Sequence, residues 1–192
     1  MRVVHLSDPL TILVDVVAWG AIHASAGYVA HRTSVAWLSR DRWLFRERRL
    51  EGGGRLYART LRISRWKDRL PEAGALFAGG ISKRRVTAAE WGGLGRFVVE
   101  TRRAELAHWL AAWPGVVFAL WNPPAVVPIM VAYGLAVNLP FVAVQRYNRI
   151  RAARVLRRRD APRVRASGSA PASAEARAAR RRSADTTGNS IP

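Results

Sequence analysis

A long stretch without basic residues restricts the fold of this chain more than any other feature. Residues 104–145 contain no Lys or Arg and one acid, Glu105, whereas 17 of the 32 Lys and Arg lie in residues 40–103 and 12 in residues 149–182. One membrane-crossing helix takes about 20 residues, so this stretch is too long for one crossing and suits two. The pattern predicts a helical hairpin in a membrane, with a basic segment on each side of it.

The hairpin is expected to turn at WNPPA, residues 121–125, because an Asn followed by two prolines does not continue a helix. Its two spans are then about residues 104–121 and 126–144. An earlier apolar segment, residues 9–30, has 22 residues and is also long enough to cross a membrane. A cleaved secretory signal is the alternative for this segment, since Ala24-Ser25-Ala26 has the small-residue spacing of a cleavage site.

Basic residues collect on the cytoplasmic side of membrane proteins. Both basic segments are cytoplasmic if one span precedes the first and a pair of spans separates the two, which places the N-terminus outside. We therefore expect an all-α integral membrane protein with about three transmembrane helices, formed by residues 1–158. A basic cytoplasmic loop at residues 40–103 would lie at the membrane surface, with Thr60–Trp66 as an alternative short strand. Residues 159–192 lack large apolar side chains, apart from Val164 and Ile191, and are expected to form a disordered basic tail.

The second span has two different faces when it is drawn as a helix. One face carries small and polar residues, namely Thr101, Ala104, Glu105, His108, Ala111, Ala112 and Gly115, and the other carries Leu106, Trp109, Leu110, Trp113 and Val117. Small residues let another helix or a substrate approach closely, and ionisable groups within a membrane usually face an interior cavity. The polar face predicts a site built on Glu105 and His108. Alternatively, these two residues mark the wet end of the span or bond a neighbouring helix.

Several common kinds of site are excluded or disfavoured by the residues present. The chain has no cysteine, which excludes disulfides, thiol catalysis and cysteine metal sites. No metal site is expected, because Glu105 and His108 supply at most two ligands and the other histidines lie in the first span or near its ends. The sequence EGGGR, residues 51–55, lacks the Lys-Ser/Thr of a P-loop and is typical of a flexible turn. No G-x-S-x-G serine-hydrolase motif is present.

Four stretches of the chain occur in an order that resembles a known family. They are WKDRLPEAGALF (66–77), FVVETRRAELAHW (97–109), WNPPAVVPIMVAYGLAVNLPF (121–141) and QRYNRIRAARVLRR (145–158). Together they resemble the glycosyl-4,4'-diaponeurosporenoate acyltransferase family of small bacterial membrane proteins. The likeness covers about residues 60–158. It implies transfer of a fatty acyl group to a sugar hydroxyl of a glycosylated carotenoid or another glycolipid in the plasma membrane, with acyl-CoA as co-substrate and no other cofactor.

The implied reaction assigns roles to the polar face of the second span. Ester formation needs a base that takes the hydroxyl proton as the oxygen attacks a thioester, and neutral histidine is suited to this near pH 7. We expect His108 to be this base. Glu105, one turn earlier on the same face, is expected to hold the imidazole in the required tautomer and to favour its charged form.

Cations are needed for the phosphate groups of acyl-CoA, and guanidinium groups bind phosphate through a fork of N–H donors. We expect this role for Arg65, Lys67, Arg69, Arg102 and Arg103. The alternative is that these residues anchor the protein at the cytoplasmic membrane surface. Asp68, which lies among them, would either fold back to His108 or pair with a neighbouring Arg.

The last span contains Asn138-Leu139-Pro140, which is expected to break the helix because Pro140 has no backbone N–H to donate. This leaves a backbone carbonyl near residue 136 unpaired, and the gap would accept a substrate hydroxyl, with Asn138 as a substrate-binding residue. The alternative is a packed kink filled by the Asn138 side chain. At the following membrane boundary, Arg146 and Arg149 are expected to contact lipid phosphate or the donor, and Asn148 is a further candidate for substrate binding.

Two other classes of function remain as alternatives. The chain would be a non-catalytic membrane protein if its basic loop and tail only held anionic lipid or a partner protein. This reading requires the summed charge, whereas the enzyme requires Glu105 and His108. A nucleic-acid-binding protein is supported by charge alone, and no recognisable binding fold is present, so no nucleic acid is expected as a partner.

Overall fold

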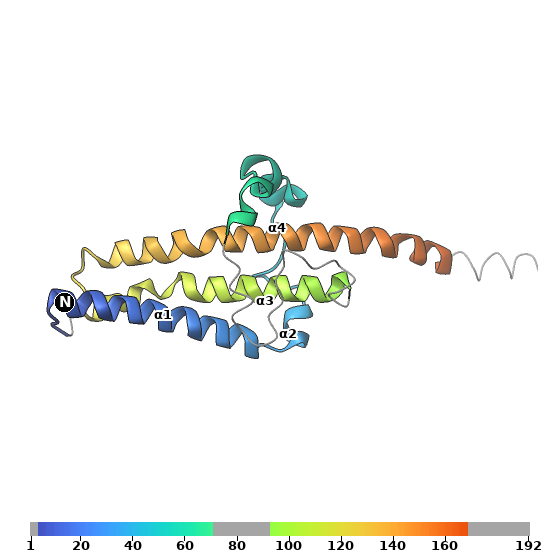
Figure 1. The fold of residues 1–192 in the computed structure, drawn as a ribbon. Coiled ribbons are helices and arrows are strands. Elements are labelled where there is room, and N and C mark those ends of the chain that lie inside the picture. The colour runs from blue at the N-terminus through green and yellow to red at the C-terminus, as the bar shows by residue number, and fades with distance from the viewer. Residues whose placement is uncertain (1–3, 71–92, 169–192) are drawn as a thin grey trace, which may run out of the picture. The chain divides into compact units, whose positions relative to one another are not determined.

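The computed structural model describes residues 4–70 and 93–168, with side chains as far as Arg159. Contacts divide the chain into two units, Met1–Ala153 and Arg154–Pro192, which are described separately. The α-helices are α1 (Asp8–Arg32), α2 (Val35–Ser39), α3 (Leu94–Ala112) and α4 (Val127–Gly168) (Figure 1). Shorter helical turns are η1 (Arg49–Gly54), η2 (Leu56–Thr60), η3 (Ile63–Arg65), η4 (Lys67–Arg69) and η6 (Pro114–Leu120).

The described residues contain no strand, so the all-α prediction is confirmed for this part of the chain. The alternative of a short strand at Thr60–Trp66 is wrong. The chain there ends the π-helical turn η2 and continues into the 3-10 turn η3. Tertiary packing overrides the local strand preference, because Ile63 is fully buried against α4.

Two helices among the described residues are long and apolar enough to cross a membrane. They are α1, which includes the predicted span 9–30, and residues 127–159 of α4, which cover all but the first residue of the predicted span 126–144. Large apolar side chains are exposed along α1, η6 and the first part of α4, namely Ile12, Leu13, Val16, Val17, Val116, Val117, Leu120, Ile129 and Leu139. Such an apolar surface is unusual in a water-soluble monomer and suits lipid. The protein therefore associates with a membrane.

The predicted middle span, residues 104–121, is not one continuous α-helix. α3 begins earlier than predicted, at Leu94, and ends at Ala112. The chain then continues as the 3-10 turn η6, which begins at Pro114. Proline has no N–H for an α-helical hydrogen bond, and this explains why the α-helix does not continue through the whole apolar stretch.

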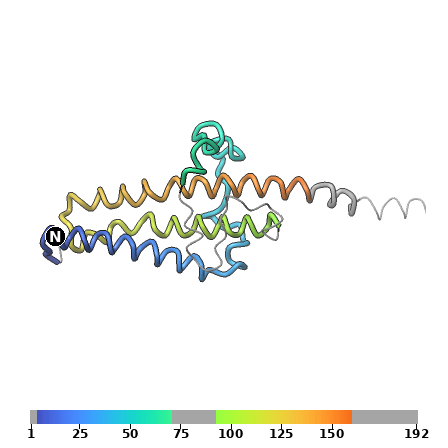
Figure 2. The backbone as a smooth tube through the Cα atoms, viewed as in Figure 1, coloured from blue at the N-terminus to red at the C-terminus, as the bar shows by residue number. Residues whose placement is uncertain are grey.

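α3 packs against both α1 and α4, as the trace in Figure 2 shows. The predicted small and polar face of α3 faces the protein, because Thr101, Glu105, Ala111 and Ala112 are buried. Two glycines permit the close approach. A Cβ on Gly115 would lie 2.8 Å from the Val131 backbone, and one on Gly134 would lie 2.7 Å from the Ala112 carbonyl. The close helix packing predicted from small residues is confirmed.

The predicted break at Pro140 is wrong, because α4 continues through this residue. Asn138 is buried within the helix, and its side-chain amide donates to the Gly134 carbonyl at 2.9 Å. This is the packed alternative rather than an open gap. A proline inside a helix costs about 3 kcal/mol, which packing of α4 against α1 and α3 offsets.

The segment after α2 packs against the helices at two apolar clusters. Tyr57 and Ile63 pack with residues of α4, namely Val144, Tyr147 and Ile150. Leu38 and Phe45 pack with Val99 of α3. These clusters place the first part of the predicted basic loop, residues 40–70, directly beside the polar faces of α3 and α4.

Two predicted features lie wholly or partly outside the described residues. The rest of the basic loop includes residues 71–92, and most of the predicted disordered tail lies in residues 169–192. Within the second unit, α4 continues helically to Gly168. The predicted disorder of the tail and the boundary at residue 158 stay predictions.

Candidate active site

Arg102 and Arg103 bind the carbonyl ends of two other helices. Arg102 donates through Nη1 to the carbonyls of Leu38, Ser39 and Arg40 at 2.8–3.1 Å, at the end of α2. Arg103 donates in the same way to the carbonyls of Ala30, His31 and Thr33 at 2.7–2.9 Å, at the end of α1. Cations are favourable at helix C-termini, where the last carbonyls have no partner within the helix. The two arginines predicted to bind phosphate thus fasten α1 and α2 to α3.

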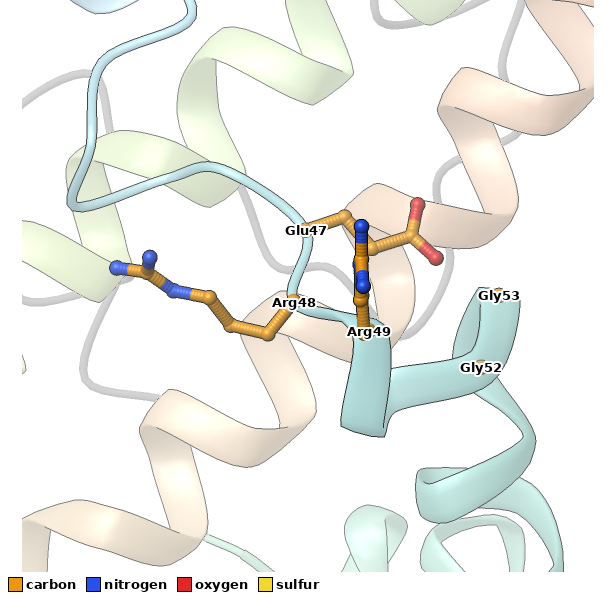
Figure 3. Close-up of a pocket in the computed structure, with 5 residues that line it drawn as sticks. All are labelled: Glu47, Arg48, Arg49, Gly52 and Gly53. Atoms are coloured by element: carbon orange, nitrogen blue, oxygen red, sulfur yellow. The ribbon is translucent and has the colours of Figure 1, made fainter.

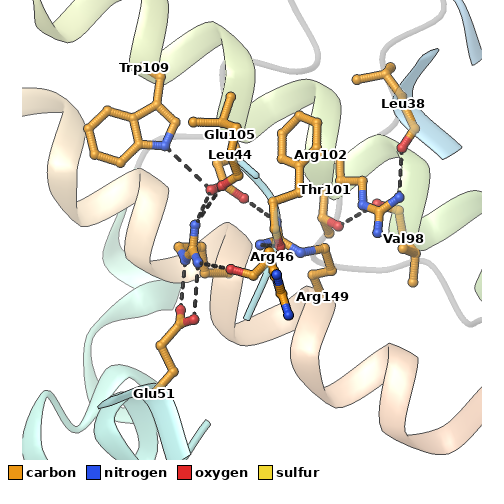
Figure 4. Close-up of polar contacts among 12 residues, drawn as sticks. Leu38, Leu44, Arg46, Glu51, Val98, Thr101, Arg102, Glu105, Trp109 and Arg149 are labelled. Atoms are coloured by element: carbon orange, nitrogen blue, oxygen red, sulfur yellow. Dashed lines mark hydrogen bonds and ion pairs between the residues drawn. The ribbon is translucent and has the colours of Figure 1, made fainter. Parts of the chain in front are cut away.

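Glu105 lies in the middle of a buried cluster of charges (Figure 4). Its side chain is fully buried, and one carboxylate oxygen accepts from Arg146 at 2.8 Å. The same oxygen also accepts from the indole N–H of Trp109 at 3.4 Å, and the other oxygen accepts from Arg149. The carboxylate that was predicted to orient His108 is therefore bound by two arginines of α4.

Arg146 uses all five of its N–H donors within the protein. Nε and Nη2 bind the two carboxylate oxygens of Glu51 at 2.7 and 3.0 Å, a bidentate pair. The remaining donors bind Glu105 and the carbonyls of Leu44 and Arg46 at 2.8–3.0 Å. Arg146 therefore joins α3 to the segment that follows α2.

Glu51 reaches Arg146 because three glycines follow it. Gly52, Gly53 and Gly54 have φ angles of 53°, 67° and 89°, in the left-handed region that residues with a side chain rarely adopt. The sequence EGGGR forms a turn, as predicted. The turn points the Glu51 carboxylate inward, where it also accepts from the Tyr57 hydroxyl and the Arg48 backbone N–H.

The surroundings of Glu51 lower the pKa of its carboxyl group. Burial alone would raise this pKa, but hydrogen bonds from Arg146, the Arg48 backbone and Tyr57 outweigh burial and lower it to about 2. Burial and the charge of Glu51 raise the pKa of the Tyr57 hydroxyl. Glu51 is therefore charged and Tyr57 neutral at neutral pH.

His108 lies one turn further along the same face of α3 and contacts a different part of α4. Its Nδ1 lies 3.0 Å from Oδ1 of Asn138. Its ring stacks on Phe141, with ring centroids 4.6 Å apart and planes inclined by 12°. The predicted base and the predicted polar residue of the last span are therefore brought together, within hydrogen-bond distance of each other.

His23 of α1 lies on the other side of Asn138. Its Nε2 is 3.5 Å from Nδ2 of Asn138, and its Nδ1 is 2.9 Å from the Trp19 carbonyl. Three helices thus contribute one residue each to a line of polar groups from His23 through Asn138 to His108. This line lies where Gly134 allows α3 and α4 to approach closely.

The other predicted site residues lie apart from this line. Lys67 and Asp68 form an ion pair at 2.5 Å. The Asp68 side chain is 69% exposed and Arg69 is exposed, which leaves both in contact with solvent. Asn148 is half-buried on α4.

A depression in the surface lies beside the glycine turn (Figure 3). Its lining residues are Glu47, Arg48, Arg49, Gly52 and Gly53. The Arg48 side chain extends away from Glu47 in this view, and its guanidinium lies 4.5 Å from the ring centre of Trp43. The depression presents arginines of the basic loop but lies outside the line of His23, Asn138 and His108.

Sequence reasoning missed Glu51 and His23 as partners of the site, and it expected Arg149 to contact lipid phosphate or the donor rather than Glu105. The sequence EGGGR could have indicated Glu51, because three glycines permit a tight turn and such a turn can direct the preceding acid toward the interior. His23 carried a second signal, as an ionisable group within an apolar span. Neither signal names the partner residue, since Glu51 and Arg146 are 95 positions apart.

Comparisons with known proteins agree with this part of the chain. The family model described as Glycosyl-4,4'-diaponeurosporenoate acyltransferase matches residues 41–158, more than half of the chain. A protein of that name from Staphylococcus haemolyticus strain JCSC1435 is 31% identical over 139 residues, covering 72% of this chain and 81% of the relative. One from Staphylococcus aureus strain MRSA252 is 24% identical over 139 residues, covering 72% and 84%. No solved structure matches the chain.

The matched region includes the contacts of α4 with Glu105 and with His108. It contains Glu51, Glu105, His108, Asn138 and Arg146, and it begins earlier than the resemblance seen at residues 60–158. The resemblance is confirmed. The protein is an acyltransferase, and its chain belongs to the glycosyl-4,4'-diaponeurosporenoate acyltransferase family.

Proposed function

We propose that the protein esterifies a sugar hydroxyl of a glycosylated carotenoid, or of a related glycolipid, with a fatty acyl group taken from acyl-CoA. The relatives are named for a glycosylated carotenoid acid, which motivates this choice of acceptor. Both substrates combine an apolar chain with a polar head. A reaction site near the end of an apolar helix bundle suits such molecules.

The position of His108 is the observation that carries the proposal. His108 is half-buried, stacked on Phe141 and bonded to Asn138, at the level where the apolar part of α3 begins. An imidazole in this setting can take the proton of a sugar hydroxyl as its oxygen bonds to the acyl carbon of the thioester. The carbon–sulfur bond then breaks, and the proton passes from the imidazole to the departing sulfur to give free CoA thiol.

Three spans with the N-terminus outside remain our preferred topology. Arg103 joins α3 to the end of α1, and at the opposite end the Val4 N–H donates to the Leu120 carbonyl at 3.0 Å. Asp15 accepts from Trp121 and Asn122 at 2.7 and 2.8 Å near the same end. The last turns of α3 together with η6 therefore run alongside α1 from one end to the other. A 3-10 turn rises about 2.0 Å per residue, which lengthens this segment relative to an α-helix.

The donor is expected to bind at the cytoplasmic side through basic residues of the loop. Arg102, Arg103 and Arg146 are bonded to backbone carbonyls and acids, so their contribution is to hold the site together. Exposed cations such as Arg69, and Lys67 beside Asp68, are the better candidates for the CoA phosphates.

The test is mass spectrometry of lipid extracts from a host that lacks the gene and is complemented with variants. Wild-type protein should restore a glycolipid that carries one additional fatty acyl group. His108→Ala should fail to do so, because removing a general base costs about 10²–10⁴-fold in rate. His5→Ala, which changes an exposed histidine before α1, is the matched control and should behave as wild type.

Two outcomes would contradict the proposal. If deletion of the gene changes no acylated lipid, a non-catalytic membrane role through the basic loop and tail becomes the better explanation. If His108→Ala restores full acylation at wild-type protein levels, the transferase role stands and His108 is not its base.

A further inference from the structure

The contact between His108 and Asn138 indicates which ring nitrogen of His108 carries the proton. A neutral imidazole carries its single N–H on either Nδ1 or Nε2, and the nitrogen without the proton is the base. The tautomer is set by the hydrogen bond that the other nitrogen makes. The orientation of the Asn138 amide therefore decides which nitrogen of His108 can act.

The orientation of the Asn138 amide is fixed by its second partner. Asn138 is 1% exposed, and its side chain lies 2.9 Å from the Gly134 carbonyl. A carbonyl only accepts, so the amide must present its NH₂ group to Gly134. Its oxygen then faces Nδ1 of His108 at 3.0 Å. Because this oxygen only accepts, Nδ1 of His108 must carry the proton.

His23 extends the same assignment by one residue. Its Nδ1 faces the Trp19 carbonyl at 2.9 Å and must donate to it, which leaves Nε2 of His23 as an acceptor. This acceptor faces the NH₂ group of Asn138 at 3.5 Å, the outer edge of hydrogen-bond distance. The hydrogen bonds thus run in one consistent direction from His108 to Asn138, from Asn138 to His23, and from His23 to the backbone of α1.

We infer that Asn138 is a positioning residue, backed by His23, that holds His108 in the tautomer whose Nδ1 carries the proton and whose Nε2 is the base. This inference rests on the proposed function and gives it a single reacting atom. The orienting role that was predicted for Glu105 is thereby assigned to Asn138, which contacts the imidazole at 3.0 Å.

Phe141 completes the constraint on the ring. Asn138 fixes one edge of the imidazole, and Phe141 covers one face in a nearly parallel stack. Both residues lie on one face of α4, three positions apart, so a single rigid helix sets both the rotation and the plane of the ring. An orienting amide is neutral, which makes it less costly than a carboxylate in an apolar helix bundle.

The direct test is the tautomer of His108 in full-length protein labelled with ¹⁵N-histidine and held in lipid nanodiscs. Two-bond ¹H–¹⁵N correlation spectra distinguish a protonated from an unprotonated ring nitrogen, and the spectrum of His108→Ala assigns the signal. Wild-type His108 should show a protonated Nδ1 and an unprotonated Nε2. A protonated Nε2 in the wild-type protein at neutral imidazole would overturn the inference.

Variants of Asn138 connect the tautomer to the rate. Asn138→Leu removes the acceptor at similar size, so Nδ1 should lose its preference for the proton and kcat should fall by about 10²-fold or more, with a smaller change in KM. Asn138→Asp keeps an acceptor and should retain the Nδ1–H tautomer. It should also keep kcat within about tenfold of wild type. Leu139→Ala, which changes an exposed neighbour on α4, is the control and should change neither.

These outcomes separate the inference from the proposed function. Wild-type kcat in Asn138→Leu would overturn the positioning role while leaving the acyl transfer intact. Absence of acyl transfer in wild type would overturn the proposed function, whereas the wild-type tautomer would still be read from the spectrum. If Asn138→Leu fails to fold, the wild-type spectrum and the Asn138→Asp rate decide the question.

Discussion

The polar face of α3 meets α4 in two regions of opposite character. Around Glu105 the contacts are between full charges, and every donor of Arg146 is bonded within the protein. Around His108 the hydrogen bonds link two imidazoles and one amide, and they involve no carboxylate or guanidinium group. Charged groups whose hydrogen bonds are all made within the protein are costly to disturb. An imidazole can carry its proton on either nitrogen and can therefore take part in proton transfer. Under the proposed function, the charged region holds the site together and the region around His108 supplies the base.

Removal of the Glu105 carboxylate is expected to cause a large loss of stability. Glu105→Ala would leave Arg146 and Arg149 buried without this carboxylate, and breaking a buried pair in this way costs about 3–5 kcal/mol. Thermal unfolding in detergent micelles should show a much lower Tm for this variant. Glu47→Ala, which changes an exposed acid, should leave Tm close to wild type. Equal effects of the two substitutions would mean that the cluster does not hold the fold.

His108→Ala should show the opposite combination. Asn138 and Phe141 are uncharged, so the loss of the contacts with them should cost about 1–2 kcal/mol, and the protein should remain folded. Acylation should nevertheless fall by about 10²–10⁴-fold. Measuring Tm and acylation on the same preparations separates the two regions, since a large fall in Tm would assign His108 to the framework instead.

Much of this arrangement was accessible from the sequence, because it depends on local patterns. The two apolar segments at residues 9–30 and 126–144, and the small and polar face of α3, follow from composition and a helical period. The partners of that face were not accessible. Glu105 was assigned to His108 because they are neighbours in sequence, but the two arginines that bind it lie 41 and 44 positions away.

The effect of Pro140 also depends on tertiary packing that the sequence does not reveal. A proline correctly indicates a missing backbone hydrogen bond, but whether the helix bends or continues depends on what packs around it. The Asn138 side chain was expected to meet a substrate hydroxyl. Instead it donates to Gly134 and accepts from His108, and this required the positions of three helices to be known.

The close approach of the helices leads to a third prediction. Gly134→Ala places a Cβ about 2.7 Å from the Ala112 carbonyl and 2.8 Å from the Trp19 ring, so the backbones must separate. Overpacking of this kind costs about 1–3 kcal/mol, and the shift would also lengthen the contact between His108 and Asn138. Tm and acylation should both fall. Gly20→Ala, where a Cβ would meet no atom within 4 Å, is the matched control and should change neither.

The charged region also predicts a specific response to acid. The pKa of Glu51 is lowered from 4.5 to about 2 in the folded protein, so the stabilisation is complete above pH 4.5. It decreases as the pH falls from about 4.5 towards 2, because the unfolded state takes up the proton more readily than the folded state. Tm measured across this range should fall less steeply with decreasing pH in Glu51→Gln than in wild type. Parallel curves would show that other acids dominate.

The smallest effect is expected at the exposed ion pair of Lys67 and Asp68. The side chain of Asp68 is 69% exposed, and surface pairs contribute about 0–1 kcal/mol because solvent screens them. Lys67→Ala should therefore leave Tm nearly unchanged. If Lys67 binds the CoA phosphates, the same variant should raise KM for acyl-CoA without lowering kcat, and the increase should shrink at high salt. An unchanged KM would remove Lys67 from the donor site, while a large fall in Tm would show that the difference between buried and exposed charges has been misjudged.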